Sequence, residues 1–115
     1  MDKLKLRSEF DAVMAAGIVA VTSHFALHQQ NNPISSRIGA VVPKRWARKS
    51  VTRNLIKRQI YALSIEELAT LPQADRVIRL RKTFDTHQFC SASSENLKKA
   101  VRDELQQLIQ TALSI

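Results

Sequence analysis

Cysteine is almost absent from this chain, since the sequence contains only Cys90. A single thiol excludes an intramolecular disulfide, and it excludes a metal site built on paired cysteines. Such sparing use of cysteine is typical of a reducing compartment, so we expect a cytoplasmic protein.

Long hydrophobic runs are also missing, which excludes two further classes of protein. No apolar stretch approaches the length that a helix needs to cross a bilayer. The N-terminus does not resemble a signal peptide, because Glu9 and Asp11 interrupt the place where its apolar region would begin. We therefore expect no membrane partner.

The size and composition predict one folded domain covering residues 1–115. The chain is 44% hydrophobic, which is typical of a globular protein, and 115 residues can bury a modest core. No internal repeat, low-complexity tract or shift in composition marks a second domain.

Acidic residues are absent from residues 37–65, and cations are concentrated within that stretch. Residues 44–58, KRWARKSVTRNLIKR, include seven Lys or Arg, and the whole chain has a net charge of +8 with a pI near 10.3. This density of like charge repels itself unless an anion faces it. Nucleic acid is the commonest anionic partner of such a surface.

The basic stretch is also periodic, which favours a helix over a disordered tail. With Ser50 as the cap and 100° per residue, one half of the helical wheel is mainly apolar: Val51, Leu55, Ile56, Gln59, Ile60, Ala62 and Leu63. The other half is cationic or can form hydrogen bonds: Arg53, Asn54, Lys57, Arg58 and Tyr61. We predict a helix over about 50–65 that buries the first half and exposes the second.

The remaining patterns predict the element order αβββαβα. The first helix is expected from Ser8, with Asp11 as its capping partner, to Gly17. Strands are expected at 18–22, 25–30, 38–42 and 76–81, and a last helix at about 94–113. Helices on a mostly β platform predict an α+β fold, a two-layer α/β sandwich.

Three consecutive features resemble the protein subunit of bacterial ribonuclease P. They are the helix–glycine start EFDAVMAAG, the strand RIGAVVPKR, and a helix directly after it with the motif RN-x-x-KR. The family pattern is a basic pair, a short loop, and then A-V-x-R-N-x-x-K-R-x-x-R-E. The residues that match it here are Lys44, Arg45, Val51, Arg53, Asn54, Lys57 and Arg58. The resemblance spans nearly the whole chain and implies this family's unusual left-handed strand–helix–strand crossover.

The chain departs from the family pattern at several positions. Ser50 replaces the usual alanine, and Tyr61-Ala62 replaces the terminal Arg-Glu, so the last turn of that helix is expected to hold RNA less tightly. Met14 replaces a second aromatic residue in the first helix. His28 replaces the tyrosine of the strand pattern F-x-L-Y.

The resemblance implies an endoribonuclease subunit that acts in removal of the 5′ leader from precursor tRNA. Ribonuclease P RNA would supply the catalytic groups, and Mg²⁺ would be held mainly by that RNA and the substrate. This chain would then contain neither a catalytic residue nor a metal site. Its expected RNA-binding residues are Lys44, Arg45, Arg48, Lys49, Arg53, Asn54, Lys57 and Arg58. A solvated charged face is the alternative, and the lack of acidic partners at i, i+4 argues against it.

A second surface would receive the single-stranded leader. The resemblance makes Phe10 and Phe25 candidates to line this leader-binding cleft, with Met14 and His28 as secondary ones, because unpaired bases stack on aromatic side chains. Ordinary core packing is the alternative for all four. Trp46 also has two interpretations, since it could stack on a base or cover the end of the sheet.

Other classes of protein fit the sequence less well. A self-contained enzyme lacks a catalytic cluster, because His24 and His28 would be about 13 Å apart in a strand, and His87 and Cys90 have no evident third member. A helix-turn-helix or ribosome-associated RNA- or DNA-binding module is the alternative function. The strand expected before the basic helix argues against helix-turn-helix. No feature of the sequence predicts a homo-oligomer.

Overall fold

The computed structural model describes residues 2–68, 71–84 and 95–113, so His87 and Cys90 lie outside the described residues. The elements in chain order are β1 (Asp2–Lys3), α1 (Arg7–Ala16), β2 (Ile18–Val21), β3 (Phe25–Asn31), β4 (Arg37–Val41), α2 (Ser50–Glu67), β5 (Ala74–Leu80) and α3 (Glu95–Leu113). This order confirms the α+β prediction and adds one element, β1. Its two residues are both exposed and give no hydrophobic pattern to detect.

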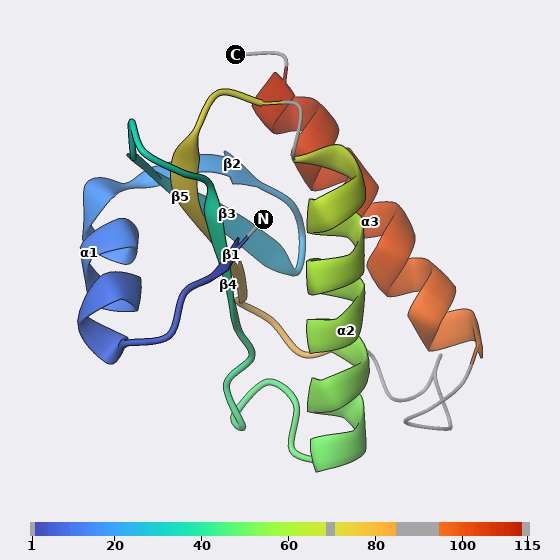
Figure 1. Cartoon of the computed structure of the whole chain (residues 1–115). Coiled ribbons are helices and arrows are strands. Elements are labelled where there is room, and N and C mark those ends of the chain that lie inside the picture. The colour runs from blue at the N-terminus through green and yellow to red at the C-terminus, as the bar shows by residue number, and fades with distance from the viewer. Residues whose placement is uncertain (1, 69–70, 85–94, 114–115) are drawn as a thin grey trace.

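One sheet contains all five strands, in the order β1-β4-β5-β3-β2. β5 lies at its centre, parallel to β4 and antiparallel to β3. β4, α2 and β5 therefore form a parallel strand–helix–strand unit between adjacent strands (Figure 1). None of the helices in the described ranges is both long and apolar enough to cross a bilayer.

Helices cover both faces of the sheet (Figure 1). α2 and α3 enclose the main core on one face, and α1 covers a smaller core on the other. The predicted two-layer sandwich describes the α2/α3 side, and α1 adds a cover on the opposite side. The largest fully buried side chains of the main core are Phe25, Leu27, Ile38, Ile56, Ile60, Leu63, Leu68, Ile78, Leu80, Leu105, Leu108 and Ile109.

Alternation along the strands assigns side chains to these two faces. On β5, Ile78 belongs to the main core while Val77 belongs to the smaller core under α1. On β3, Leu27 belongs to the main core, whereas His28 reaches the backbone of α1. Each central strand thus supplies both faces of the sheet.

α1 begins at a different capping arrangement from the predicted one. The helix starts at Arg7, so the proposed pair of Ser8 and Asp11 is not its cap. Glu9 Oε1 instead accepts hydrogen bonds from the backbone N–H groups of Lys5 at 3.0 Å and Leu6 at 2.8 Å. A glutamate in the first turn satisfies the free N–H groups in the same way as a capping box.

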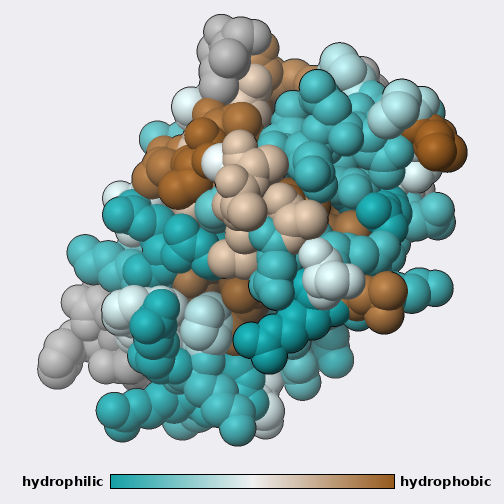
Figure 2. All heavy atoms as spheres, turned by 90° about the vertical axis from the view of Figure 1, so that its left-hand side faces the viewer, coloured by the Kyte–Doolittle hydropathy of each residue, from teal (hydrophilic) through white to brown (hydrophobic). Residues whose placement is uncertain are grey.

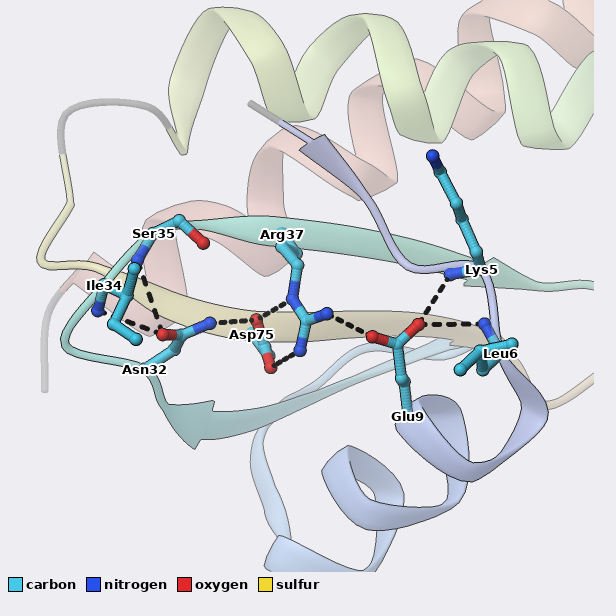
Figure 3. A network of polar contacts seen from close by, with 8 residues as sticks. All are labelled: Lys5, Leu6, Glu9, Asn32, Ile34, Ser35, Arg37 and Asp75. Atoms are coloured by element: carbon cyan, nitrogen blue, oxygen red, sulfur yellow. Dashed lines mark hydrogen bonds and ion pairs between the residues drawn. The ribbon is translucent and has the colours of Figure 1, made fainter.

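Arg37 connects this glutamate to the central strand (Figure 3). Its Nε donates to Asp75 Oδ1 at 2.9 Å, its second terminal nitrogen donates to Asp75 Oδ2 at 2.6 Å, and its first pairs with Glu9 Oε2. Asn32 Nδ2 adds a bond to Asp75 Oδ1 at 3.0 Å. The pKa of Asp75 is lowered mainly by Arg37 and also by Asn32. The pKa of Glu9 is lowered by the backbone N–H groups of Leu6 and Lys5, and then by Arg37. One bidentate arginine therefore joins α1, β4 and β5.

Phe10 packs against β4 at Gly39, where the absence of a side chain makes room for the ring. A Cβ placed on Gly39 would lie 2.3 Å from Phe10 Cε1 and 3.1 Å from Leu4 Cδ1. A glycine inside a strand often marks such a close approach by another group. Gly39 thus leaves the space that the ring of Phe10 occupies on this face of the sheet.

We predict that Arg37→Met destabilises the fold most at neutral pH and least in acid. The folded-state pKa values of Asp75 and Glu9 are lowered, so the stability gained from their ionised forms is complete above their unfolded pKa values, about 4. That stability is lost as the pH falls through the folded values. The difference in free energy of unfolding between parent and variant should therefore narrow below about pH 4.

Urea unfolding at a series of pH values measures this difference. Lys98→Met is the control, because Lys98 is exposed and forms no ion pair with a described residue. If the difference in free energy of unfolding between the parent and Arg37→Met stays constant down to acidic pH, Arg37 contributes through packing alone.

Candidate nucleic-acid interface

No carboxylate occurs between Asp11 and Glu66. This acid-free stretch contains β2, β3, β4, the loop that follows and all of α2 except its last two residues. Cations in this part of the structure therefore have few acidic neighbours in sequence. Any anion that neutralises them must come from a distant segment or from another molecule.

The charges of α2 are arranged against the helix dipole. A helix end is stabilised by acidic residues in the first turn and basic residues in the last. α2 has no acidic residue in its first turn and no basic residue in its last turn, and Glu66 and Glu67 lie at its C-terminal end. Its N-cap, Lys49, makes no capping side-chain bond. Positive potential is thus uncompensated at the N-terminal half, where free N–H groups favour an anion.

Most of the predicted RNA-binding residues are exposed on this half of α2 and the adjoining loop. None of them forms an ion pair with a residue of the described ranges. We call this surface the basic face and define it as Lys44, Arg45, Arg48, Lys49, Asn54, Lys57 and Arg58. The opposite side of α2 packs in the main core through Ile56, Ile60 and Leu63, as predicted.

Arg53 differs from its neighbours because its guanidinium folds back onto the loop. One terminal nitrogen donates to the carbonyl oxygens of Ala47 at 3.0 Å and Arg48 at 2.7 Å. Two bonds from one group hold the loop against the first turns of α2. The remaining guanidinium N–H groups are available to another acceptor. Phosphate binding by Arg53 stays a prediction, and the structure adds a role in positioning the loop.

Trp46 packs on the protein in this structure. The indole is half-buried against the main core, and its Nε1 is buried with no hydrogen-bond partner among the described residues. The guanidinium carbon of Arg45 lies 5.1 Å from the ring centroid. Of the two roles that the sequence left open, packing on the protein is the one seen in this structure, and stacking on a base stays a prediction.

The side of α2 that is buried differs in part from the apolar half of the predicted helical wheel. Tyr61, placed on the polar half, packs against the main core, and its hydroxyl accepts a bond from the backbone N–H of Ala40 at 3.3 Å. Val51, placed on the apolar half, is 54% exposed, and Ala62 is also exposed. A wheel gives the angles between side chains but not where β4 and α3 lie around the helix.

Three of the four predicted cleft residues lie together on the α1 side of the sheet. Phe10 and Met14 are half-buried around the smaller core. Nδ1 of His28 lies 3.1 Å from the carbonyl oxygen of Met14. Figure 2 views this side and shows apolar side chains gathered among hydrophilic ones.

Phe25 does not join these three residues, so its predicted placement in the cleft is wrong. Its side chain is fully buried in the main core, 5.9 Å from the ring centroid of Phe84. Phe25 and His28 are an odd number of residues apart on one strand, and such residues face opposite sides of a sheet. Core packing, the alternative given for Phe25, is what the structure shows.

Arg79 is a residue of this surface that the sequence analysis did not identify. β5 pairs it with Val41 on β4 and with Ala26 on β3. Its Nε lies 3.3 Å from Nε2 of His28. The sequence feature that could have identified Arg79 is its even spacing from Val77, which places both residues on one face of β5. We call Phe10, Met14, His28, Val41 and Arg79 together the α1 face.

The described part of the chain has no metal centre. No three His, Cys, Asp or Glu side chains within it are placed to hold a metal ion. Glu9 and Asp75, the carboxylates near the α1 face, are both engaged by Arg37. The two surfaces are suited to binding an anion rather than a cation.

Comparison with known proteins agrees with this geometry. The family model described as Ribonuclease P matches residues 1–111. The ribonuclease P protein component of Ralstonia pickettii (strain 12J) is 33% identical over 111 residues, which cover 96% of this chain and 78% of that protein. The component of Burkholderia mallei (strain SAVP1) is 29% identical over 110 residues, covering 96% and 81%.

Solved structures show the same fold. The RNase P protein of Staphylococcus aureus matches with a TM-score of 0.76 and 19% identity, over 97% of this chain and 95% of that one. The RNase P protein of Thermotoga maritima matches with a TM-score of 0.68 and 21% identity, over 96% and 97%. With a matching family model over nearly its whole length and a basic RN-x-x-KR helix exposed beside the sheet, this chain belongs to the ribonuclease P protein family.

Proposed function

We propose that this chain is the protein subunit of a ribonuclease P ribonucleoprotein and holds precursor tRNA to the catalytic RNA during leader removal. The observation that best supports this function is the separation of two anion-attracting surfaces. The basic face lies on α2 and its preceding loop, and the α1 face lies on the other side of the sheet. One protein with two such surfaces can contact two RNA segments at once.

The basic face is proposed to bind the RNA partner. Lys57 and Arg58 are exposed without acidic partners among the described residues and can reach phosphates, while Asn54 can bond a base edge or a 2′-hydroxyl. A helix-turn-helix protein would place a helix before the reading helix. Here β4 precedes α2, so the DNA-binding alternative is not favoured.

The α1 face is proposed to receive the single-stranded 5′ leader. Phe10 and Met14 offer partly exposed apolar surface, and Arg79 adds a positive charge. Stacking of a base on an aromatic side chain contributes about 1–3 kcal/mol and tolerates any sequence. Phe25 is left out of this surface because it is buried on the other side of the sheet.

The basic face does not fit a role in holding Mg²⁺. The basic face lies within a stretch without carboxylates, and hard cations need oxygen ligands such as these. We therefore place the metal on phosphate oxygens of the RNA partner and substrate, and we assign no bond-breaking step to a side chain. A cytoplasmic location, where both RNAs would be met, belongs to the same proposal.

Reconstitution tests the function directly. The purified chain mixed with a bacterial ribonuclease P RNA should restore 5′ cleavage of precursor tRNA at low Mg²⁺, where the RNA alone is slow. The chain freed of RNA should cleave nothing, with or without Mg²⁺. Failure to stimulate the RNA, or metal-dependent cleavage at the tRNA 5′ boundary by the protein alone, would overturn the proposal.

We predict that charge on the basic face matters more than equal charge elsewhere. The double variant Lys57→Ala/Arg58→Ala should bind ribonuclease P RNA more weakly and reduce the slope of log affinity against log salt by about one per lost phosphate contact. Lys98→Ala/Lys99→Ala on α3 removes the same charge from exposed positions and should change little. Equal effects of the two variants would show that binding follows net charge alone.

Arg53 should act partly by holding the loop in place, and this effect distinguishes it from Lys57. Arg53→Ala removes the bonds to Ala47 and Arg48, so we expect weaker RNA binding together with a red-shifted emission of Trp46, the only tryptophan. Lys57→Ala should weaken binding with no change in emission. Unchanged Trp46 emission in a folded Arg53→Ala protein would disprove the loop-positioning role.

A further inference from the structure

Arg79 is a cation on the central strand that pairs with no carboxylate of the described residues. It lies on the central strand, beside Val41 and Ala26 on the neighbouring strands, and its side chain is half-buried. Within the described ranges it forms no ion pair. Arg37, on the same face, is by contrast neutralised by two carboxylates.

His28 fixes the direction of the Arg79 side chain. Its Nδ1 lies 3.1 Å from the carbonyl oxygen of Met14, and because a carbonyl can only accept, Nδ1 carries the hydrogen. The lone pair of Nε2 then faces Arg79, whose Nε donates to it at 3.3 Å. Burial, and then the charge of Arg79, lower the pKa of His28, so the imidazole is neutral at neutral pH.

This arrangement uses one N–H of Arg79 and leaves both terminal nitrogens of the guanidinium. No residue in the described part of the chain accepts a hydrogen bond from them. The terminal nitrogens present paired donors in a plane, a geometry that matches two oxygens of a phosphate. An oriented, unpaired fork of this kind is suited to a phosphate diester.

Arg79 lies at the end of the α1 face that is nearest to the basic face. β4 and β5 are parallel, so their C-terminal ends lie at the same edge of the sheet. Lys44 and Arg45 follow the end of β4, and Arg79 lies one residue before the end of β5. Phe10 and Met14, on α1, lie beside Gly39 of β4 and His28 of β3, which pair with Val77 farther from this edge. An RNA strand that runs from the basic pair to α1 therefore passes over Arg79.

We propose that Arg79, oriented by His28, binds a backbone phosphate of the precursor tRNA leader. This inference rests on the proposed function and names a contact within it. Arg79 would bind any leader sequence, because phosphate contacts position a strand without reading its bases. His28 is in this scheme a positioning residue rather than a stacking partner for a base.

The experiment uses the holoenzyme reconstituted from the full chain and ribonuclease P RNA. Arg79→Gln should weaken binding of precursor tRNA about tenfold, as expected for one charge-assisted contact, and leave mature tRNA binding unchanged. Lys98→Gln is the matched control and should change neither. Methylphosphonates placed one at a time in the leader should weaken binding to the parent at one position where Arg79→Gln shows no further loss.

The role of His28 is tested by coupling. His28→Phe keeps an aromatic ring but removes the acceptor, so it should weaken leader-dependent binding, and the double variant should be no weaker than Arg79→Gln alone. His28→Gln, whose amide can both donate and accept, should recover part of the loss. Additive losses, or an equal loss for mature tRNA, would show that His28 acts through the fold and not through Arg79.

The two proposals fail in different ways. A parent holoenzyme that binds precursor and mature tRNA equally would overturn the proposed function, and this inference with it. A parent that discriminates between them, beside an Arg79→Gln variant that discriminates equally and keeps the same methylphosphonate sensitivity, would overturn only the role of Arg79.

Discussion

The pairing of β5 between β4 and β3 is the constraint on which the rest of the structure depends. Because side chains alternate along a strand, this register directs Ile78 to the main core and Val77 and Arg79 to the α1 face. A slip by one residue would exchange these positions, exposing Ile78 and burying Arg79, and both changes cost free energy. The Arg37–Asp75 pair supports the same register, since it joins residues that are paired across β4 and β5.

Burial in the main core stabilises α2 although its charges oppose the helix dipole. Ile56, Ile60 and Leu63 are almost fully buried, and each such side chain contributes roughly 1.5–3 kcal/mol. An unfavourable charge at a helix end costs only about 0.3–1 kcal/mol. The core can therefore tolerate an N-terminal half that is electrostatically unfavourable in the free protein and favourable beside an anion. Arg102, which pairs with Glu66 at 2.9 Å, adds a link to α3 away from that half.

The sequence predicted what depends on local periodicity and missed what depends on neighbours. The helices and main strands were found within about two residues, because apolar spacing sets them. The helical wheel misplaced Tyr61 because the contacts of this side chain depend on where β4 lies. The cap of α1 was misassigned because Glu9, which caps the helix, is also paired with Arg37 on a distant strand. The error at Phe25 was different. Phe25 and His28 are three residues apart on β3, so the strand period places them on opposite faces, contrary to what the family resemblance implies.

The two proposed RNA surfaces differ in how far the sequence could reveal them. The basic face was visible because its cations are consecutive and the stretch has no acid. Arg79 could not be found that way, since Arg76 and Arg81 flank it closely. Its even spacing from Val77 separates it from Arg76, but only the structure shows which of these cations is left without a carboxylate among the described residues. Arg76 is buried on the other face with Gln29, whereas Arg79 is half-buried and held by a neutral histidine. The proposed function therefore depends on which cations lack a partner among the described residues after folding, and the number of cations is a poor guide to it.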